Sequence, residues 1–499
     1  MDREDNRLPG TAPEEMNLIS EPVRADSTMG SQTADDSAIL PVQEDNAQPE
    51  NASVECTVAA QPDNSREGAQ NNARPADIPV QDSSHLNKNG ESEQVSTGVD
   101  EQEQHMSDSD VMRHTASLWR YRTVAENGTE LHTEYHGKYT KTGIGEMIGA
   151  RVRGKKHKHE GTNCDDWFET AVADGCFIAV VADGAGSKQL SRIGARVSCE
   201  SAVEYLKTAI PEMFARDAGL RSKLSGDMSG EDFLGACGQF AAMIRKSAET
   251  AFDSVIKKLK SLYSDQNYIS TLGRNPTLAD MGSTFLAAVA VPVEVNGERQ
   301  RFVVTLQIGD GCICAIDSKA DHNGCFRLLG EADSGAYSGE TEFLSERTVS
   351  EGVIARKIRI SRGRSDILML MSDGVADDYF PAQPMMKRLY LDLWLNGILP
   401  MRGECQGRKE PEPLKFPAVT PEQQPVAIQY AKQLLSENSD DAVNELWDSR
   451  DTLAPYSLAA WGSSLGDRPD NRLQSWLDNY NERGSFDDRT LVVMNFDVG

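Results

Sequence analysis

The sequence predicts an α+β fold, in which strands and helices occupy separate stretches of the chain. Strand-like runs at residues 145–154 and 165–182 come first, and two helical stretches follow them. Further strand-like runs then return in series between residues 283 and 375. Strands, a pair of helices and then many strands favour segregated α+β packing over a doubly wound parallel sheet, in which strands and helices would alternate.

The first 110 residues differ in composition from the rest of the chain. They hold 24 acidic and 6 basic residues, and the first aromatic side chain of the protein is Trp119. A segment with this much charge and so few large apolar side chains does not bury enough surface to offset the entropy of folding. We therefore expect residues 1–115 to form a disordered acidic tail and residues 116–499 to form the folded domain.

Charge and hydropathy exclude several classes of partner. Residues 1–110 account for −18 of the formal net charge of −27, and the remaining −9 is ordinary for a soluble domain. This balance does not favour a nucleic-acid partner. No apolar run approaches the roughly 20 residues that cross a bilayer, and the N-terminus has no apolar signal core. We therefore expect a cytoplasmic protein that does not bind a membrane.

The first part of the folded domain predicts strands followed by two helices. Residues 145–154 are predicted as the first strand, with a basic turn after it, and residues 165–187 as two strands joined at Asp174 and Gly175. Apolar residues at helical spacing then predict two helices that cover one face of a sheet. They are Ile193, Val197, Val203 and Leu206 in the first helix and Phe233, Phe240, Ile244, Phe252, Ile256 and Leu259 in the second, over residues 231–262.

The second part predicts a series of strands and a helical insertion. The strand-like runs are STFLAAVAVPV, QRFVVTLQIGD, GCICAID, FRLLG, GVIARKIRI and DILMLMSDGV. From about residue 379 to residue 484 the pattern is helical and interrupted by prolines, which indicates an insertion with an irregular linker around 400–425. The last run, RTLVVMNFDV, is predicted as the closing strand.

Aspartates stand at the ends of several apolar runs. Asp183, Asp310 and Asp373 each follow one, whereas Asp487 and Asp488 precede the last. A simple turn is the first alternative for any one of them, because Asp-Gly after a strand is the commonest hairpin signal. Asp310 fits a hairpin well, since another strand follows it. Asp183 and Asp373 do not, because each leads into a helical stretch.

Acids at the ends of neighbouring buried strands would converge at one rim of a sheet. Several carboxylates share a partly buried site only when cations neutralise them. Oxygen ligands without a nearby His or Cys suit Mg²⁺ or Mn²⁺ and not zinc, and the adjacent glycines let a carbonyl or a bulky anion approach closely. Two such ions about 4 Å apart would lower the pKa of a bridging water and hold the oxygens of a phosphate ester.

An ordered series of short motifs runs through these strand ends. The motifs are Asp165 with Asp166, Asp183 with Gly184, Gly282 with Ser283 and Thr284, Gly309 with Asp310, Ser372 with Asp373 and Gly374, and Asp487 with Asp488 and Thr490. The series resembles that of the metal-dependent protein phosphatases of the type 2C class, over most of residues 145–499. The segments RGKKHKHEGTNCDD and GETEFLSE are most similar to the bacterial branch of that family.

The resemblance implies a fold, a cofactor and a set of site residues. The fold is a four-layer α-β-β-α sandwich with two central antiparallel sheets flanked by helices, and the cofactor is a pair of Mg or Mn ions. The implied metal ligands are Asp183, the carbonyl of Gly184, Asp373 and Asp487, with Asp310 available for a third, looser ion. Asp166 is implied to hold water at the ions, so that the catalytic set comprises Asp166, Asp183, Asp373 and Asp487.

The sequence departs from the family pattern at two positions. The arginine that grips phosphate in many members is replaced by Gly161, and the histidine that often follows the Asp-Gly pair is replaced by Ala185. The basic run RVRGKKHKH offers substitutes, and Arg153 and His157 are the candidate phosphate-binding residues. The alternative for this run is a solvated turn whose charge balances acidic neighbours.

These observations favour an enzyme over two alternatives. Residues 116–499 are expected to be a catalytic domain that hydrolyses phosphoserine or phosphothreonine in a phosphorylated protein substrate, as part of a Ser/Thr kinase system. A weak or inactive phosphatase-like module that binds phosphoproteins or regulates a partner is the main alternative, which the two departures support. A metal-dependent nuclease is disfavoured by the net charge of the domain.

Overall fold

The structure is a computed structural model. It describes residues 118–320, 324–332, 341–399, 424–435, 443–444, 468–479 and 486–496. The predicted acidic tail, residues 1–115, and most of the predicted irregular linker at 400–425 lie outside the described residues.

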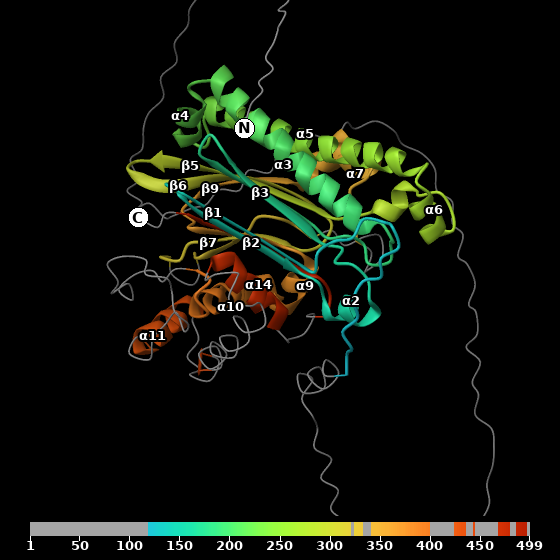
Figure 1. Ribbon diagram of the computed structural model, residues 1–499. Coiled ribbons are helices and arrows are strands. Elements are labelled where there is room, and N and C mark those ends of the chain that lie inside the picture. The colour runs from blue at the N-terminus through green and yellow to red at the C-terminus, as the bar shows by residue number, and fades with distance from the viewer. Residues whose placement is uncertain are drawn as a thin grey trace, which may run out of the picture. The chain divides into compact units, whose positions relative to one another are not determined.

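Two antiparallel sheets form the centre of the described part of the chain (Figure 1). The first has the strand order β1-β2-β11-β10-β7-β8. Its strands are β1 (Tyr135–Thr142), β2 (Gly145–Val152), β7 (Cys312–Ile316), β8 (Phe326–Leu328), β10 (Ile367–Met371) and β11 (Arg489–Phe496). The second has the order β3-β4-β5-β6-β9. Its strands are β3 (Trp167–Ala173), β4 (Cys176–Ala182), β5 (Phe285–Val295), β6 (Glu298–Ile308) and β9 (Ile358–Gly363).

The strand β4 shows why the central strands are continuous apolar runs. Every residue of Cys176–Ala182 is buried. Phe177 and Val181 pack in the core between the two sheets, whereas Ile178 and Val180 pack in the core under the helices. A strand covered on both faces gains from apolar side chains at every position, so no polar alternation remains to reveal its register.

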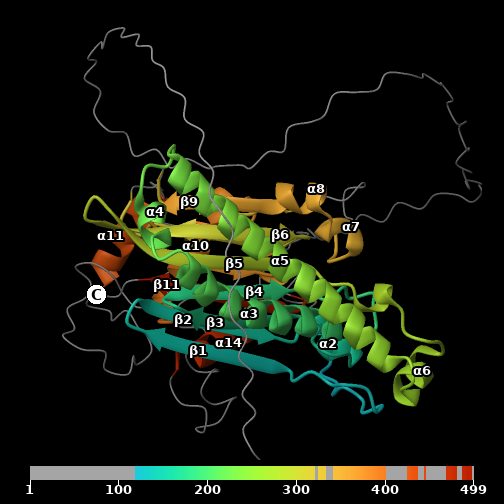
Figure 2. The ribbon, with the colours of Figure 1, turned by 90° about the horizontal axis from the view of Figure 1, so that it is seen from above.

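Two long helices cover the five-stranded sheet (Figures 1 and 2). They are α3 (Ser191–Arg216) and α5 (Glu231–Leu262), so the bounds predicted for the second helix are confirmed. All of the predicted apolar stripe of α5 is buried except Ile256, which packs partly buried against the same core. The short helix α4 (Leu220–Ser225) lies between them in the chain, and the short helix α6 (Gln266–Leu272) follows α5.

Helices of the predicted insertion cover the six-stranded sheet (Figure 1). They are α10 (Ala382–Leu395) and α14 (Pro469–Asn479), and α11 (Gln424–Leu435) packs against α10. Trp394 of α10 and Trp476 of α14 are buried in the core against this sheet. With helices on the outer face of each sheet, the predicted four-layer α-β-β-α sandwich is confirmed.

The remaining elements are short and lie in connections. They are α2 (Lys155–Glu160), α7 (Glu346–Val349), α8 (Glu351–Ile354), α9 (Asp373–Ala376) and the 3-10 helices η1 (Leu278–Met281), η2 (Ala355–Lys357) and η3 (Asp377–Tyr379). Among the described helices, none combines the length and the apolar character that a membrane-spanning segment requires.

Four local predictions were wrong. The predicted strand run GVIARKIRI begins with the helix α8 and the 3-10 helix η2, and only its last three residues belong to β9. The first strand is β1 and not β2, because β1 is a polar, half-buried edge strand without an apolar run. The basic turn predicted after residue 154 is the helix α2. Asp310 does not lie in a hairpin, because β6 and β7 pair with strands of different sheets. Its Gly-Asp-Gly turn carries the chain from one sheet to the other.

Candidate active site

Three strand-end aspartates meet at one rim of the two sheets. Asp183 follows β4, Asp310 follows β6 and Asp373 follows β10 as the first residue of α9. One carboxylate oxygen of each lies within 4.8 Å of those of the other two. The two sheets therefore contribute to one acidic group, because β10 belongs to the six-stranded sheet and β4 and β6 to the other.

Asp487 lies beside this group, directly before β11. Its side chain is 50% exposed, and its Oδ1 is 3.9 Å from Nε2 of His157. The charge of Asp487 contributes to raising the pKa of both Asp183 and Asp373, after the larger effect of burial. The open position of Asp487 leaves its carboxylate accessible from solvent.

The glycine after Asp183 is required by a close approach of main chains. Gly184 pairs with Ser283 in an isolated antiparallel bridge. A Cβ atom added to Gly184 would lie 2.6 Å from the carbonyl oxygen of Asp165. A side chain at this position would push the loop away from Asp165, so glycine brings the loop and the acid pair together.

The electrostatics of the acidic group favour a bound cation. Burial and the neighbouring carboxylates raise the pKa of Asp183 well above its usual range. Burial also raises the pKa of Asp373 to about 7, together with the charges of Asp310 and Asp487. Carboxylates that repel one another in this way are neutralised either by protons or by a cation. The all-oxygen donor set fits a hard divalent ion such as Mg²⁺ or Mn²⁺.

Asp166 ties the two sheets together at the same rim. Its Oδ2 accepts hydrogen bonds from Oγ of Ser372 at 2.8 Å and from Oγ1 of Thr490 at 2.6 Å. Its Oδ1 is buried, and no described residue donates a hydrogen bond to it. Burial, followed by the charge of Asp488, raises the pKa of Asp166 to about 7. Oδ1 is thus a fixed acceptor for a small donor such as water.

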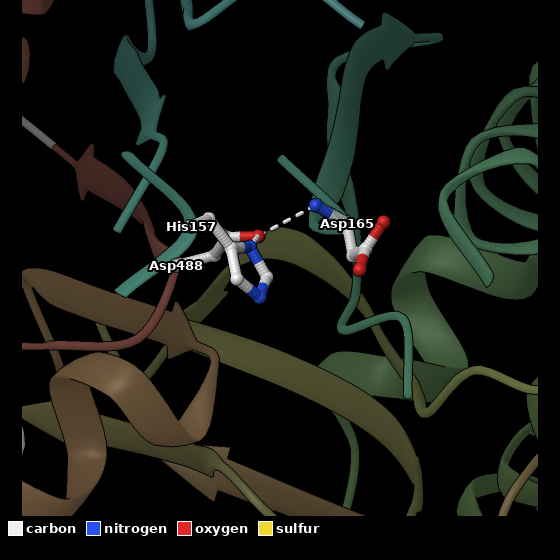
Figure 3. A group of neighbouring side chains, drawn as sticks. All are labelled: His157, Asp165 and Asp488. Atoms are coloured by element: carbon white, nitrogen blue, oxygen red, sulfur yellow. Dashed lines mark hydrogen bonds and ion pairs between the residues drawn. The ribbon is translucent and has the colours of Figure 1, made fainter. Parts of the chain in front are cut away.

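Asp488 is a buried acceptor that joins several segments of the chain, and no pattern in the sequence predicted it as a site residue. Its Oδ1 accepts a hydrogen bond from the backbone N–H of Gly154 at 2.6 Å. Its Oδ2 accepts one from the backbone N–H of Asp165 at 2.5 Å and lies 2.7 Å from Nδ1 of His157 (Figure 3). The double acid before the last strand was visible in the sequence, but its partners lie more than 300 residues away in the chain.

His157 and Arg153, the two candidate phosphate-binding residues, have different surroundings. Burial alone lowers the pKa of His157, but Asp488 outweighs it and raises the pKa to about 9, so the imidazole is a cation at neutral pH. Its Nε2 faces the loop after Asp183, since a Cβ atom added to Gly186 would lie 3.9 Å from it. Arg153 instead donates to the carbonyl oxygens of Arg122 at 2.6 Å and His157 at 2.8 Å.

The described contacts of Arg153 support the main chain. Its guanidinium also lies 3.8 Å from a carboxylate oxygen of Glu134 and over the ring of Tyr121. The structure therefore brings His157 toward the acidic group, whereas the described partners of Arg153 lie in the segments that precede it and in α2.

Gly161 and Ala185, the two residues that depart from the family pattern, each have a defined place in the backbone structure. Gly161 is the C-cap of α2 in a left-handed conformation, with φ of 80°. An arginine there would be strained, because only glycine adopts this conformation without cost. Ala185 donates its backbone N–H to the carbonyl oxygen of Gly282 at 3.1 Å. This bond holds the loop after Asp183 against the start of β5.

Asp310 has one paired and one unpaired oxygen. Its Oδ2 accepts a hydrogen bond from the hydroxyl of Thr341. Its Oδ1 is buried, and no described residue donates a hydrogen bond to it. The neighbouring Leu344 donates its backbone N–H to the carbonyl of Ser283 at 2.9 Å, so the segment around residue 341 is attached to the same rim.

Binding of Mn²⁺ is expected to release protons. Asp373, with a pKa raised to about 7, holds a proton below that pH, and the raised pKa of Asp183 also favours its protonated form, whereas only the ionised carboxylates ligate a cation. Mn²⁺ affinity should therefore rise by about tenfold per pH unit below pH 7 for the proton that Asp373 releases, and this contribution should level off at higher pH. Calorimetric titrations in two buffers with different ionisation enthalpies would measure the protons. An affinity that is constant from pH 5.5 to 8 would contradict the expectation.

The four-layer sandwich with a cluster of carboxylates at its rim is the arrangement that the resemblance to type 2C phosphatases implies. The family model described as protein phosphatase 2C matches residues 153–396, and this part of the chain belongs to that family. The match includes Asp166, Asp183, Asp310 and Asp373. It ends before the last strand, so Asp487 lies outside the matched residues.

Solved structures, two of them named as phosphatases, are similar to the chain. Serine/threonine phosphatase Stp1 from Staphylococcus aureus is 12% identical over 75% of this chain and 100% of its own, with a TM-score of 0.31. Serine-threonine phosphatase 2C from Toxoplasma gondii is 12% identical over 73% and 99%, with a TM-score of 0.37. RsbX in complex with magnesium is 10% identical over 72% and 100%, with a TM-score of 0.27. None of the curated proteins matches the sequence.

Proposed function

We propose that the chain is a metal-dependent protein serine/threonine phosphatase that uses two Mg or Mn ions. The observation that carries the proposal is the meeting of Asp183, Asp310 and Asp373 within 4.8 Å at the rim of two sheets. The proposed ligands are Asp183, the carbonyl of Gly184, Asp373 and Asp487, with Asp310 for a third, looser ion. When bound, the ions supply an activated water and stabilise negative charge on the phosphate oxygens.

The chain itself orients the attacking water. We assign this role to Oδ1 of Asp166, which is buried and lacks a described donor. Its position is held because Oδ2 of the same carboxylate is bonded to Ser372 and Thr490. A fixed acceptor reduces the entropy that a water molecule loses when it is aligned with the phosphorus atom.

His157 supplies a cation for the phosphate. Asp488 fixes its Nδ1, which leaves the Nε2 proton to be donated toward the rim, 3.9 Å from Asp487. A charge-assisted hydrogen bond from this donor would replace part of the contribution of the arginine that is absent at Gly161. Arg153 acts in the same proposal by holding α2, through its bond to the carbonyl oxygen of His157.

The domain division and the partners follow from the same proposal. The proposed catalytic domain comprises residues 116–499, including the insertion at about 379–484, and the acidic residues 1–115 are proposed to lie outside it. The substrate is a phosphorylated protein that a Ser/Thr kinase modifies, in a cytoplasmic setting without nucleic acid or membrane.

The test is hydrolysis of a phosphothreonine peptide by the full chain, with Mn²⁺ and with excess EDTA. We expect turnover that requires the metal and that is much slower with a phosphotyrosine peptide. His157→Gln should raise KM more than it lowers kcat, because it removes a phosphate contact. Binding of the peptide without hydrolysis in Mn²⁺ would support a phosphoprotein-binding module instead. Full activity in EDTA would remove the metal from the mechanism.

A further inference from the structure

The segment that enters the folded part of the chain lies against the helix that carries His157. This entry segment, residues 118–123, runs beside α2 (Figure 1). The backbone N–H of Arg122 donates to the carbonyl oxygen of Lys158 at 2.7 Å. The backbone N–H of Arg120 donates to Nδ1 of His159 at 2.9 Å. Two main-chain donors of one segment are thus used on the last turn of α2.

The same helix is joined to the turn that carries Asp487 and Asp488. The backbone N–H of Lys156 donates to the carbonyl oxygen of Phe486 at 2.8 Å. The backbone N–H of Gly154, which precedes the helix, donates to Asp488. The first residues of α2 are therefore fixed to the turn before β11, and its last residues to the entry segment.

The side chain of Trp119 contacts residues on both sides, in the turn before β11 and at the end of α2. Its ring stacks on Phe486, with centroids 4.6 Å apart, and lies 5.8 Å from the ring of His159. It is half-buried, whereas the preceding Leu118 is 64% exposed. One aromatic side chain thus contacts both the residue before Asp487 and the end of the helix that carries His157.

The helix α2 needs such support. It has six residues, and its N-cap Gly154 provides no side-chain hydrogen bond. A helix this short is not stable by itself in water, because few backbone bonds offset the cost of nucleation. Its position is consequently set by what it packs against.

We propose that Trp119 is a positioning residue for the active site. It holds α2 against the turn before β11 and so fixes the position of His157 relative to Asp487. This inference rests on the proposed roles of His157 and Asp487. It adds a residue outside the 153–396 family match, at the point where the chain leaves the acidic N-terminal sequence.

The test compares Trp119→Ala with Leu118→Ala in the full chain. In the metal-free protein, amide hydrogen exchange in α2 should become at least about tenfold faster in Trp119→Ala, whereas amides of β4 and β5 keep their rates. Mn²⁺ affinity, measured by calorimetry, should weaken by about tenfold. Trp119→Phe should keep amide exchange in α2 and Mn²⁺ affinity close to those of the wild-type chain, since a ring can still stack on Phe486. Leu118→Ala should match the wild-type chain.

A double-mutant cycle tests whether Trp119 acts through His157. The double variant should lose less kcat/KM than the product of the fold-losses of Trp119→Ala and His157→Gln, because both changes act on one contact. If Trp119→Ala does not fold, Arg122→Pro removes the backbone donor to Lys158 and should also speed exchange in α2. Exchange and Mn²⁺ affinity equal to those of Leu118→Ala would overturn the inference. A wild-type chain that binds Mn²⁺ without hydrolysing phosphopeptide would overturn the proposed function alone and leave the exchange test valid.

Discussion

Replacing Asp183 by asparagine is expected to lower phosphopeptide turnover by about a thousandfold or more, equivalent to roughly 4 kcal/mol in the barrier. Asparagine keeps the size and shape of the side chain but removes the charge that neutralises a cation. Asp183 also repels Asp373 and Asp166, and this repulsion adds to the effect of burial on its pKa. The metal-free variant should therefore unfold at the same temperature as the wild-type chain or higher, while its Mn²⁺ affinity collapses.

The matched control is Asp174→Asn, at the other end of β4. Asp174 occupies the β3–β4 hairpin in a left-handed conformation, with φ of 46°, which asparagine also tolerates. Its exposed ion pair with Arg221, at 3.2 Å, contributes less than about 1 kcal/mol. Turnover and Mn²⁺ affinity should remain within about twofold of wild type. Equal small losses in Asp183→Asn and Asp174→Asn would mean that Asp183 is only a turn residue.

Asp373→Asn provides a second, independent measurement of the same effect. Asp373 comes from the other sheet, and one of its carboxylate oxygens lies within 4.8 Å of that of Asp183. The two variants should lose turnover and Mn²⁺ affinity to a similar extent. A large loss in one and none in the other would show that the two acids do not share a metal.

Replacing Asp488 by alanine is expected to lower the free energy of unfolding by about 3–5 kcal/mol. The change removes the acceptor for Gly154 and Asp165, which lie next to strands of different sheets, and leaves the buried His157 cation without its counter-ion. Asp488→Asn keeps an acceptor of the same shape and should cost less. Urea unfolding, with the denaturant dependence checked for a common slope, would measure both.

A double variant tests the cause of this loss. Removing His157 together with Asp488 should cost less than the sum of the two single variants, because each single change leaves the other group unpaired. The coupling should be absent between Asp488 and Arg221, whose ion pair lies at the β3–β4 hairpin. An Asp488→Ala variant within about 1 kcal/mol of wild type would show that the buried acceptor does not hold the sheets together.

Local patterns predicted the secondary structure where one periodicity dominates a stretch. The helix α5 spans the predicted residues 231–262, because its apolar stripe repeats at 3.6 residues over many turns. The strand β1 was missed, because an edge strand with polar residues on its half-buried faces has no such signal. The turn at Asp310 was misassigned, because a hairpin and a crossover between sheets have the same local Gly-Asp-Gly sequence.

The amino-acid sequence by itself determined the fold class, the long helices, the central strands and the set of strand-end acids, since each of these depends on residues near one another in the chain. The tertiary structure decided which of these acids meet and which basic residue faces them. His157 and Arg153 belong to one basic run, yet the first is bonded to Asp488 and the second to main-chain carbonyls. His157 and Asp488 are 331 residues apart, so their pairing depends on how the sheets pack and has no local pattern in the sequence.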